Sequence, residues 1–381
     1  VGDAEVDRWL RALQLVPVGE GRWSVPSWRQ DLTREIDCIE EIARLRGYDT
    51  IPVKLHPAGV GETAAISPQW RVTAQARAAL SAHGFDEALN YSFLAEKDLA
   101  AVSPQTPLRV ANPLTTEQGA MRTTLLAGLL RNVGYNLARG VRDLRLYELG
   151  RVYLAEADGR HPSGELAWPA HEPRRLGLTL TGSRRAKSWS GGGDAADFYD
   201  LKGAVEDVLE AMGIAEARFE PDAHPALHPA SASTLLVRGQ PAGNLGQVHP
   251  RVAAHFEVPQ ETFVAELDWE ALLEHSLALK RLRGVPKFPA VARDLAFVVE
   301  ASVPAERLLE EIRGADSAKL LEHVTLFDVY RGPPVPEGRK SVAFGLSLRA
   351  PDRTLTDAEA DALCSNIRDR LKARVGAEIR A

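Results

Sequence analysis

Residues 341–348 read Ser-Val-Ala-Phe-Gly-Leu-Ser-Leu and show the clearest structural pattern in the chain. Every second position of this stretch is apolar: Val342, Phe344, Leu346 and Leu348. Successive side chains of a strand point to opposite faces, so the alternation predicts a strand with one buried face. Residues 295–299 repeat the pattern, and residues 323–330 form a third strand-like stretch. The Gly-Pro-Pro-Val-Pro run at 332–336 predicts the turn between the last two.

Helical signals lie between and after these strands. Residues 304–313 predict a helix that ends at Gly314. The Thr-Asp-Ala-Glu sequence at 356–359 is a capping box, in which the threonine and the glutamate each satisfy a free backbone N–H. It opens a long helix that we expect to reach about Arg374, and residues 377–379 predict a last strand. The order β-α-β-β-α-β is that of a ferredoxin-like split βαβ fold.

Bulk composition narrows the class of protein. With 381 residues, 45% hydrophobic and 26% charged, the chain predicts a globular protein of two or three domains. The two cysteines, Cys38 and Cys364, stand in no CxxC or CxxH pattern, which argues against a zinc site or a disulfide scaffold and fits a reducing cytoplasm. No apolar run approaches the ~18 residues of a membrane span. A net charge of −6 means that any nucleic acid must bind a local basic patch.

Two further segments precede the ferredoxin-like one. The first runs to about Thr50 and is followed by a linker rich in Pro and Gly, residues 51–68. The second, from 69 to about 279, begins with a helix that we expect to stop at Gly84. A second helix over 125–137 has apolar residues at nearly 3.6-residue spacing. Strand-like runs at 144–149, 176–180 and 234–237 predict an α+β segment with a largely antiparallel sheet.

An acidic helix begins at Glu35. Asp37, Glu40 and Glu41 stand at i, i+3 and i+4 and so share one side of it, and Asp31 precedes it closely. Carboxylates gathered on one surface repel one another unless a cation or basic groups neutralise them, and Mg²⁺ prefers such oxygen ligands. The alternative is a solvated acidic face with one ion pair to Arg44. The spacing alone leaves both interpretations open.

Other chemically suggestive residues favour structural roles. Pro225 and Pro229 interrupt His224 and His228, so these two and His249 are expected in loops and not in a metal-binding helix. No Gly-x-Ser-x-Gly nucleophile motif occurs in the sequence.

A resemblance to a known family sharpens these expectations. Residues 25–44, which contain Pro-Ser-Trp-Arg-x-Asp and Asp-x-Ile-Glu-Glu-Ile-Ala-Arg, resemble the B5 domain of phenylalanyl-tRNA synthetase β subunits, as does Gly-Tyr-Asp at 47–49. In that family the four acidic positions are assigned to a Mg²⁺ ion shared with the α subunit. The resemblance implies the same role for the matching residues: Asp31, Asp37, Glu40 and Glu41.

The middle segment is similar to the catalytic-like module of the same family. The matching stretches are residues 85–93, 112–114, 121–126, 146–153, 198–203 and 246–250. The module is a class II synthetase core in fold, but it is degenerate in this subunit. The sequence has no Gly-x-Gly-x-Gly-x-Arg segment to clamp ATP phosphates, so we expect a non-catalytic scaffold with no catalytic residues of its own. The resemblance implies that the α subunit uses the ATP.

The last segment resembles the family's ferredoxin-fold anticodon-binding domain. The matching stretches are residues 287–289, 293–299, 326–330, 339–343 and 353–356. Such a sheet presents bases and aromatics to single-stranded RNA. Four basic residues are expected on connections from which they could reach phosphates, although each alone is more often just a solubilising charge: Arg331, Arg339, Lys340 and Arg353.

Together these features predict an α+β multidomain chain. Residues 1–55 form a winged-helix-like B5 domain truncated at its start, 69–280 a degenerate class II core with an antiparallel sheet, and 287–381 a ferredoxin-like βαββαβ anticodon-binding domain. The expected role is the non-catalytic β-subunit part of a cytoplasmic phenylalanine–tRNA ligase with two α and two β subunits, which binds tRNA(Phe) and shares Mg²⁺ with α. The oligonucleotide-binding and editing modules of a full β subunit are absent from this sequence. The alternatives are an RNA- or DNA-binding adaptor and a stand-alone synthetase, and the missing ATP motif opposes the second.

Overall fold

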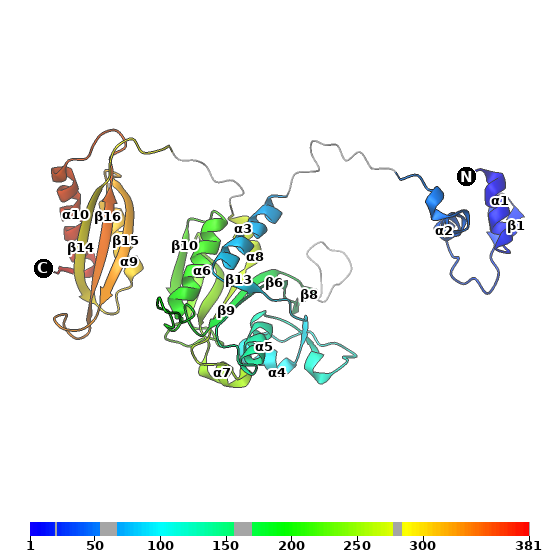
Figure 1. Cartoon of the computed structure of the whole chain (residues 1–381), viewed down its shortest axis with the longest axis horizontal. Helices are drawn as coiled ribbons and strands as arrows, with labels where there is room; N and C mark the ends of the chain where they lie inside the picture. Colours follow the sequence, from blue (N-terminus) through cyan, green and yellow to red (C-terminus); the bar gives the residue numbers. More distant parts are fainter. Residues whose placement is uncertain (20, 54–66, 156–169, 277–283, 381) are drawn as a thin grey trace. The chain divides into compact units, whose positions relative to one another are not determined.

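The computed structural model describes residues 1–19, 21–53, 67–155, 170–276 and 284–380. The chain divides into two compact units, Val1–Leu279 and Lys280–Ala381. Both contain helices and strands, which confirms the predicted α+β multidomain class (Figure 1). In the described ranges no helix combines the length and the apolarity that crossing a membrane would require.

The N-terminal residues form a small helix-hairpin-helix arrangement. Helix α1 (Asp3–Ala12) leads into a hairpin of β1 (Val16–Gly19) and β2 (Arg22–Ser24), which is followed by α2 (Glu35–Arg46) and the 3₁₀ turn η1 (Tyr48–Thr50). The start of α2 at Glu35 agrees with the prediction. Four buried side chains make its core: Leu10, Leu15, Leu32 and Ile42. Ile36 and Ile39 of α2 are more than half exposed.

A seven-stranded sheet organises the middle of the chain, in the order β10-β11-β12-β13-β9-β6-β3. The strands are β10 (Ala217–Pro221), β11 (Ser233–Val237), β12 (Gln240–Gln247), β13 (Phe263–Asp268), β9 (Arg174–Thr181), β6 (Leu144–Arg151) and β3 (Asp86–Glu87). Every neighbouring pair in this sheet is antiparallel except β3 with β6. The prediction of a largely antiparallel sheet is therefore confirmed.

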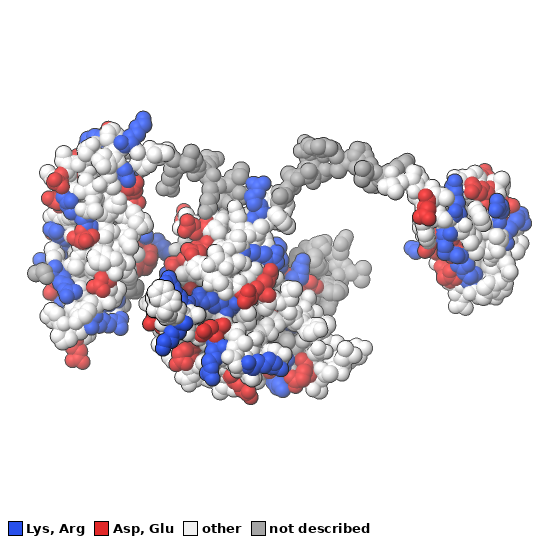
Figure 2. All heavy atoms as spheres, in the orientation of Figure 1, with Lys and Arg blue, Asp and Glu red and all other residues white. Residues whose placement is uncertain are grey.

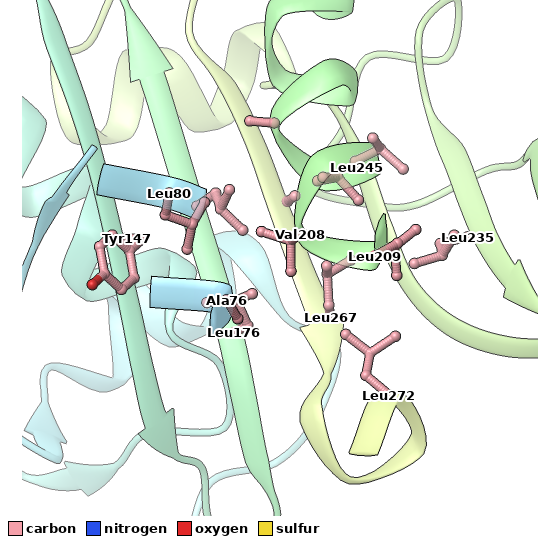
Figure 3. Close-up of a cluster of buried hydrophobic side chains, with 14 of the residues drawn as sticks. Ala76, Leu80, Tyr147, Leu176, Val208, Leu209, Leu235, Leu245, Leu267 and Leu272 are labelled. Carbon is pink, nitrogen blue, oxygen red and sulfur yellow. The ribbon is translucent and has the colours of Figure 1, made fainter. Parts of the chain in front are cut away.

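Helices cover both faces of this sheet. On one face, α3 (Pro68–Ala82), α6 (Phe198–Ala211) and α8 (Trp269–Glu274) bury a leucine-rich core, in which Leu80 and Val208 meet Leu176 and Leu267 (Figure 3). On the other face, α5 (Leu126–Leu137) packs with α4 (Glu96–Val102) and α7 (Pro250–Phe256). Gly177 of β9 lets α5 approach closely, since a Cβ there would lie 2.8 Å from Leu129 Cδ1. The two helices predicted over 69–83 and 125–137 thus exist, each shifted by about one residue.

Short elements complete this part. They are β4 (Phe93–Leu94), β5 (Ala120–Met121), β7 (Leu154–Ala155), β8 (Ala170–His171) and the 3₁₀ turn η2 (Thr116–Gln118). β4 pairs with β5, and β7 with β8, both antiparallel.

The C-terminal unit has the predicted order of elements. A four-stranded sheet, β15-β16-β14-β17, contains β14 (Val291–Glu300), β15 (Leu321–Tyr330), β16 (Arg339–Leu348) and β17 (Glu378–Ile379). Helices α9 (Ala305–Ala315) and α10 (Asp357–Val375) share one core cluster with the alternating residues of β14 and β16, so they cover one face. The other face carries no helix of the described unit. The ferredoxin-like topology is confirmed.

Candidate functional site

Four acidic residues in and just before α2 are predicted to share a metal ion, and one of them, Asp37, accepts hydrogen bonds from the backbone. Its Oδ2 accepts hydrogen bonds from the backbone N–H of Arg34 at 2.8 Å and of Thr33 at 3.0 Å. These groups precede the first turn and have no partner within the helix. The two backbone donors hold the pKa of Asp37 below its ordinary value. The carboxylate of Asp37 therefore stabilises the helix start.

Asp31 and Glu41 share one guanidinium group. Arg29 Nη2 donates to Asp31 Oδ2 at 2.6 Å and lies 3.0 Å from Glu41 Oε1. Arg44 Nη2 donates to the other oxygen of Glu41 at 2.6 Å. Hydrogen bonds from Arg44 and then Arg29 lower the pKa of Glu41, and the bond from Arg29 lowers that of Asp31. Basic side chains thus supply the neutralisation that crowded carboxylates require.

Glu40 differs from the other three. It is exposed, and its carboxylate makes no hydrogen bond or ion pair within the described part of the chain. Among the described residues no three histidine, cysteine or acidic side chains lie close enough together to hold a metal ion. The four carboxylates have the donor chemistry for Mg²⁺, but in this arrangement they do not converge, so the chain alone does not fit the ion.

The predicted RNA-binding residues of the C-terminal unit differ in exposure and in whether they already form ion pairs. The prediction that all four lie on connections is wrong for Arg339 and Lys340, which begin β16 because that strand is longer than the apolar alternation indicated. Arg339 pairs with acidic side chains on both sides, and Lys340 is 9% exposed on the strand's core-facing register. Burial, followed by the charge of Arg331, lowers the pKa of Lys340.

Arg353 and Arg331 lie on connections as predicted. The guanidinium of Arg353 pairs with Asp352 and Glu359. Arg331 is exposed, and in the described ranges its side chain has neither a hydrogen bond nor an ion pair. On the face shown in Figure 2, basic and acidic side chains are interspersed over the described parts of the chain. Two of the four predicted phosphate contacts, Arg339 and Arg353, are therefore already engaged in ion pairs, Lys340 is buried, and Arg331 is the one left exposed without an ion pair in the described ranges.

The uncovered face of the C-terminal sheet presents residues that the sequence did not single out one by one. Phe327 is 57% exposed and its ring lies against Gly345, where a Cβ would be 3.7 Å from the ring. Arg380 crosses the sheet, since its Nη1 donates to Ser341 Oγ at 3.2 Å and its guanidinium lies 5.4 Å from the Tyr330 ring centre. Arg380 could not be identified from sequence, because its position follows only from strand pairing.

A second feature that sequence reasoning missed is an apolar edge on the middle part. Residues 88–92 belong to no helix or strand and lead into β4, and every second side chain from Leu89 is exposed: Leu89 is 87%, Tyr91 77% and Phe93 42% exposed. Large apolar side chains in a row at an edge are typical of a protein–protein contact. The period-two alternation is a signal, but the sequence reads equally well as a buried strand.

A buried ion pair holds this edge in place. Arg122 Nη1 donates to Glu148 Oε1 at 2.6 Å, and the two side chains are 6% and 2% exposed. Asn90, between Leu89 and Tyr91, donates its Nδ2–H to Glu148 Oε2 at 2.7 Å. Arg122 Nε also donates to the backbone oxygen of Arg151 at 2.8 Å. The network fixes which residues of the edge face outward.

The three loop histidines make the same local contact. In each case Nδ1 accepts the backbone N–H two residues ahead, past a proline: from Ala226 to His224, from Ala230 to His228, and from Arg251 to His249. Proline has no N–H of its own, so the ring satisfies the first available donor of the turn. This agrees with the expected structural role. It also places the proton of the neutral ring on Nε2.

Comparisons with known proteins complete the description. Residues 51–269 match the family described as phenylalanyl tRNA synthetase beta chain CLM domain, residues 286–380 the ferredoxin-fold anticodon binding domain, and residues 1–48 the tRNA synthetase B5 domain. The chain is similar to proteins named phenylalanine–tRNA ligase beta subunit. It is 42% identical to that of Symbiobacterium thermophilum over 94% of this chain and 40% of the relative. It is 43% identical to that of Anaeromyxobacter dehalogenans (94% and 44%) and 41% identical to that of Moorella thermoacetica (97% and 46%).

The chain spans less than half the length of these relatives. A solved pyrrolysyl tRNA synthetase from Desulfitobacterium hafniense covers 72% of this chain and is itself covered over 86%, with a TM-score of 0.41 and 15% identity, values too low to assign a shared fold.

Proposed function

Since the chain belongs to the phenylalanyl-tRNA synthetase β chain family, we propose that it supports the ATP-dependent attachment of phenylalanine to tRNA(Phe) without performing the chemistry. In this proposal it is part of a cytoplasmic ligase with two α and two β subunits, and the α subunit holds ATP and phenylalanine. Residues 1–55 act as a winged-helix-like B5 domain, 69–280 as a degenerate class II core, and 287–381 as the anticodon-binding domain. The adaptor alternative finds no support among the matched families and relatives.

The apolar edge of Leu89, Tyr91 and Phe93 carries the proposal of an α-subunit partner. An isolated soluble domain gains nothing from three such side chains in water, and a partner that covers them gains about 25 cal/mol for each Å² of apolar surface buried. The buried contact between Asn90 and Glu148 orients the edge. We therefore place the α subunit against residues 88–94.

Co-purification with an α subunit tests this placement. Leu89→Asp and Tyr91→Asp put charges into the contact and should abolish or strongly weaken association. Val285→Asp is the matched control, because Val285 is an equally exposed apolar residue (82%) in the other unit. Association that survives both edge variants at wild-type strength would exclude the edge as the α-binding surface.

We propose that the uncovered face of the C-terminal sheet binds tRNA. Phe327 and Tyr330 offer rings for base stacking, which contributes about 1–3 kcal/mol per base in known single-strand binders. Of the predicted phosphate contacts, Arg339, Lys340, Arg353 and Arg331, the last has no ion pair among the described residues and should matter most. In filter binding to tRNA(Phe), Arg331→Ala should lower the slope of log K against log salt by about one ion. An unchanged slope would remove Arg331 from the interface.

We propose that Asp31, Asp37, Glu40 and Glu41 contribute to a Mg²⁺ site only where the α subunit adds further donors. Glu40→Gln is the informative variant, because Asp37 caps α2 and Glu41 pairs with Arg29, so changes at those two would also damage the fold. If the proposal holds, chelation and Glu40→Gln each weaken α association, and their effects do not add. Association that is indifferent to both would leave an acidic surface neutralised by arginine alone.

A further inference from the structure

A cavity of about 230 Å³ lies beside the face of the middle sheet that α5 covers. Its polar wall combines side chains from three strands and two loops: Glu266 of β13, Asn244 of β12, Arg175 of β9, Thr123 and His224. Asn244 and Glu266 are direct neighbours across β12 and β13. Ser103, Gln105 and Thr124 add further polar groups to the lining, and leucine and valine side chains of the second core cluster form part of the remainder.

Glu266 uses one of its two carboxyl oxygens for hydrogen bonds within the protein, and burial raises its pKa. Its Oε1 accepts hydrogen bonds from the Leu125 N–H at 2.6 Å and the Thr124 hydroxyl at 2.8 Å. Its Oε2 has no hydrogen-bond partner in the described part of the chain. Arg175 does not neutralise it directly, since Arg175 Nη1 donates to Asp268 Oδ2 at 2.8 Å.

Two other cavity groups are unsatisfied or only half used. Thr123 is 4% exposed, and its hydroxyl is buried without a partner among the described residues. Such a group costs stability unless a ligand or water completes it. His224 accepts the Ala226 N–H at Nδ1, which leaves Nε2–H as a donor. Burial lowers the pKa of His224, so the ring is neutral near neutral pH.

The charges and acceptors of the wall select one class of ligand. Arg175 is paired with Asp268 and His224 is neutral, so among the described residues of the wall Glu266 is the acidic group that has a carboxyl oxygen left for a cation. The acceptor atoms in this wall include Glu266 Oε2, the Thr123 hydroxyl, and the carbonyl oxygen of Asn244, whose amide N–H groups donate to Thr234 and Asp222. A primary ammonium group carries one positive charge and three N–H donors.

We propose that this cavity binds a small ligand with a primary ammonium group, a free amino acid or an amine, whose nitrogen pairs with Glu266. The donors His224 Nε2–H and Arg175 suit an oxygen or carboxylate at the ligand's other end, and the volume admits a compound of amino-acid size. The inference rests on the cavity alone and stands whether or not the chain supports tRNA charging.

Calorimetric titration of the 381-residue chain tests the proposal. The probes are L-alanine, L-leucine, L-phenylalanine, butylamine and 1,4-diaminobutane, each beside its N-acetylated form. At least one free ammonium compound should bind saturably at one site, and its acetylated form should not. If only the amino acids bind, the ligand is an amino acid. If the amines bind equally well, the ligand needs only its ammonium group. No saturable binding by any probe up to about 10 mM, a concentration far above a Kd of useful strength, would overturn the proposal.

Two substitutions separate a ligand role from a structural one. Glu266→Gln keeps an acceptor for the Leu125 N–H but removes the charge, and it should weaken binding about tenfold or more. Glu270→Gln is the control, a surface carboxylate that pairs with Arg174 outside the cavity, and it should leave binding unchanged. Thr123→Val removes the orphaned hydroxyl, so it should stabilise the free protein against urea and yet weaken binding. Equal affinity in wild type, Glu266→Gln and Thr123→Val would refute the site.

Discussion

Glu148→Gln should be among the most destabilising single changes in the unit Val1–Leu279. Glu148 is 2% exposed and accepts from Arg122 at 2.6 Å and from Asn90 at 2.7 Å. The substitution leaves the charge of Arg122, itself 6% exposed, without a buried counterion. The substitution also places the amide N–H of the glutamine against Arg122 or Asn90, which are themselves hydrogen-bond donors. Removing one partner of a buried pair costs about 3–5 kcal/mol, a large share of the ~5–15 kcal/mol that stabilises a typical domain.

Differential scanning calorimetry measures the effect. For a unit of this size about 3–5 kcal/mol corresponds to a fall in Tm of roughly 6–20 °C. Glu270→Gln is the control, since Glu270 pairs with Arg174 while half exposed and should cost less than about 1 kcal/mol. The double variant Arg122→Met/Glu148→Leu removes both charges together and should recover most of the loss. The reasoning fails if Glu148→Gln and Glu270→Gln lower Tm equally, or if the double variant is worse than the single one.

Two further predictions use matched residues. Gly134→Ala in α5 should destabilise the protein despite alanine's higher helix propensity, because its Cβ would lie 2.6 Å from Phe256 O. Gly203→Ala in α6 places its Cβ within 4 Å of no atom of the described residues beyond its chain neighbours and its own helix backbone, and should stabilise the protein by about 0.5–1 kcal/mol. Urea unfolding of the two variants beside the wild type measures both effects. Bonds led by the Thr356 backbone N–H hold the pKa of Glu359 at about 2, from an ordinary 4.5. The ionised Glu359 therefore contributes its full stabilisation of the folded state above pH 4.5 and loses it as the pH falls toward 2. In Glu359→Gln, amide exchange in α10 should therefore depend less on pH in the acid range. Equal pH profiles would contradict this.

Features set by local rules could be predicted from the sequence. The capping box formed as expected, with the Thr356 N–H donating to Glu359 Oε2 at 3.0 Å at the start of α10. Gly84 ends α3 with a positive φ of 78°, which a residue with a Cβ rarely adopts. The positions of β14 and β16 also followed from a local rule. A strand with one buried face has an apolar residue at every second position, and this alternation is visible in the sequence.

Features that depend on residues far away in the sequence could not be predicted. Gly314 was predicted to end a helix as Gly84 does, but α9 continues to Ala315. At Gly314 the side chain of Arg370 on α10 comes close, since a Cβ would lie 2.7 Å from its Nη2. Nothing within a few residues of Gly314 distinguishes it from a helix-ending glycine. The cavity at Glu266 could not be predicted from the sequence for the same reason, because residues far apart in the chain, from Val102 to Glu266, line it.

The candidate sites show why a count of charges overestimates binding residues. Spacing indicated three carboxylates on α2 and Asp31 just before it, but it could not show that Arg29, six residues before the helix, contacts Glu41. Likewise Arg339 is paired with acidic residues of its own unit. A charged side chain that is already in an ion pair must break that pair before it binds a ligand. The free energy lost with the ion pair therefore offsets most of the free energy gained from the ligand. In the described part of the chain Glu40 and Arg331 bear no such cost, and recognition of a metal or of RNA should therefore depend on them first.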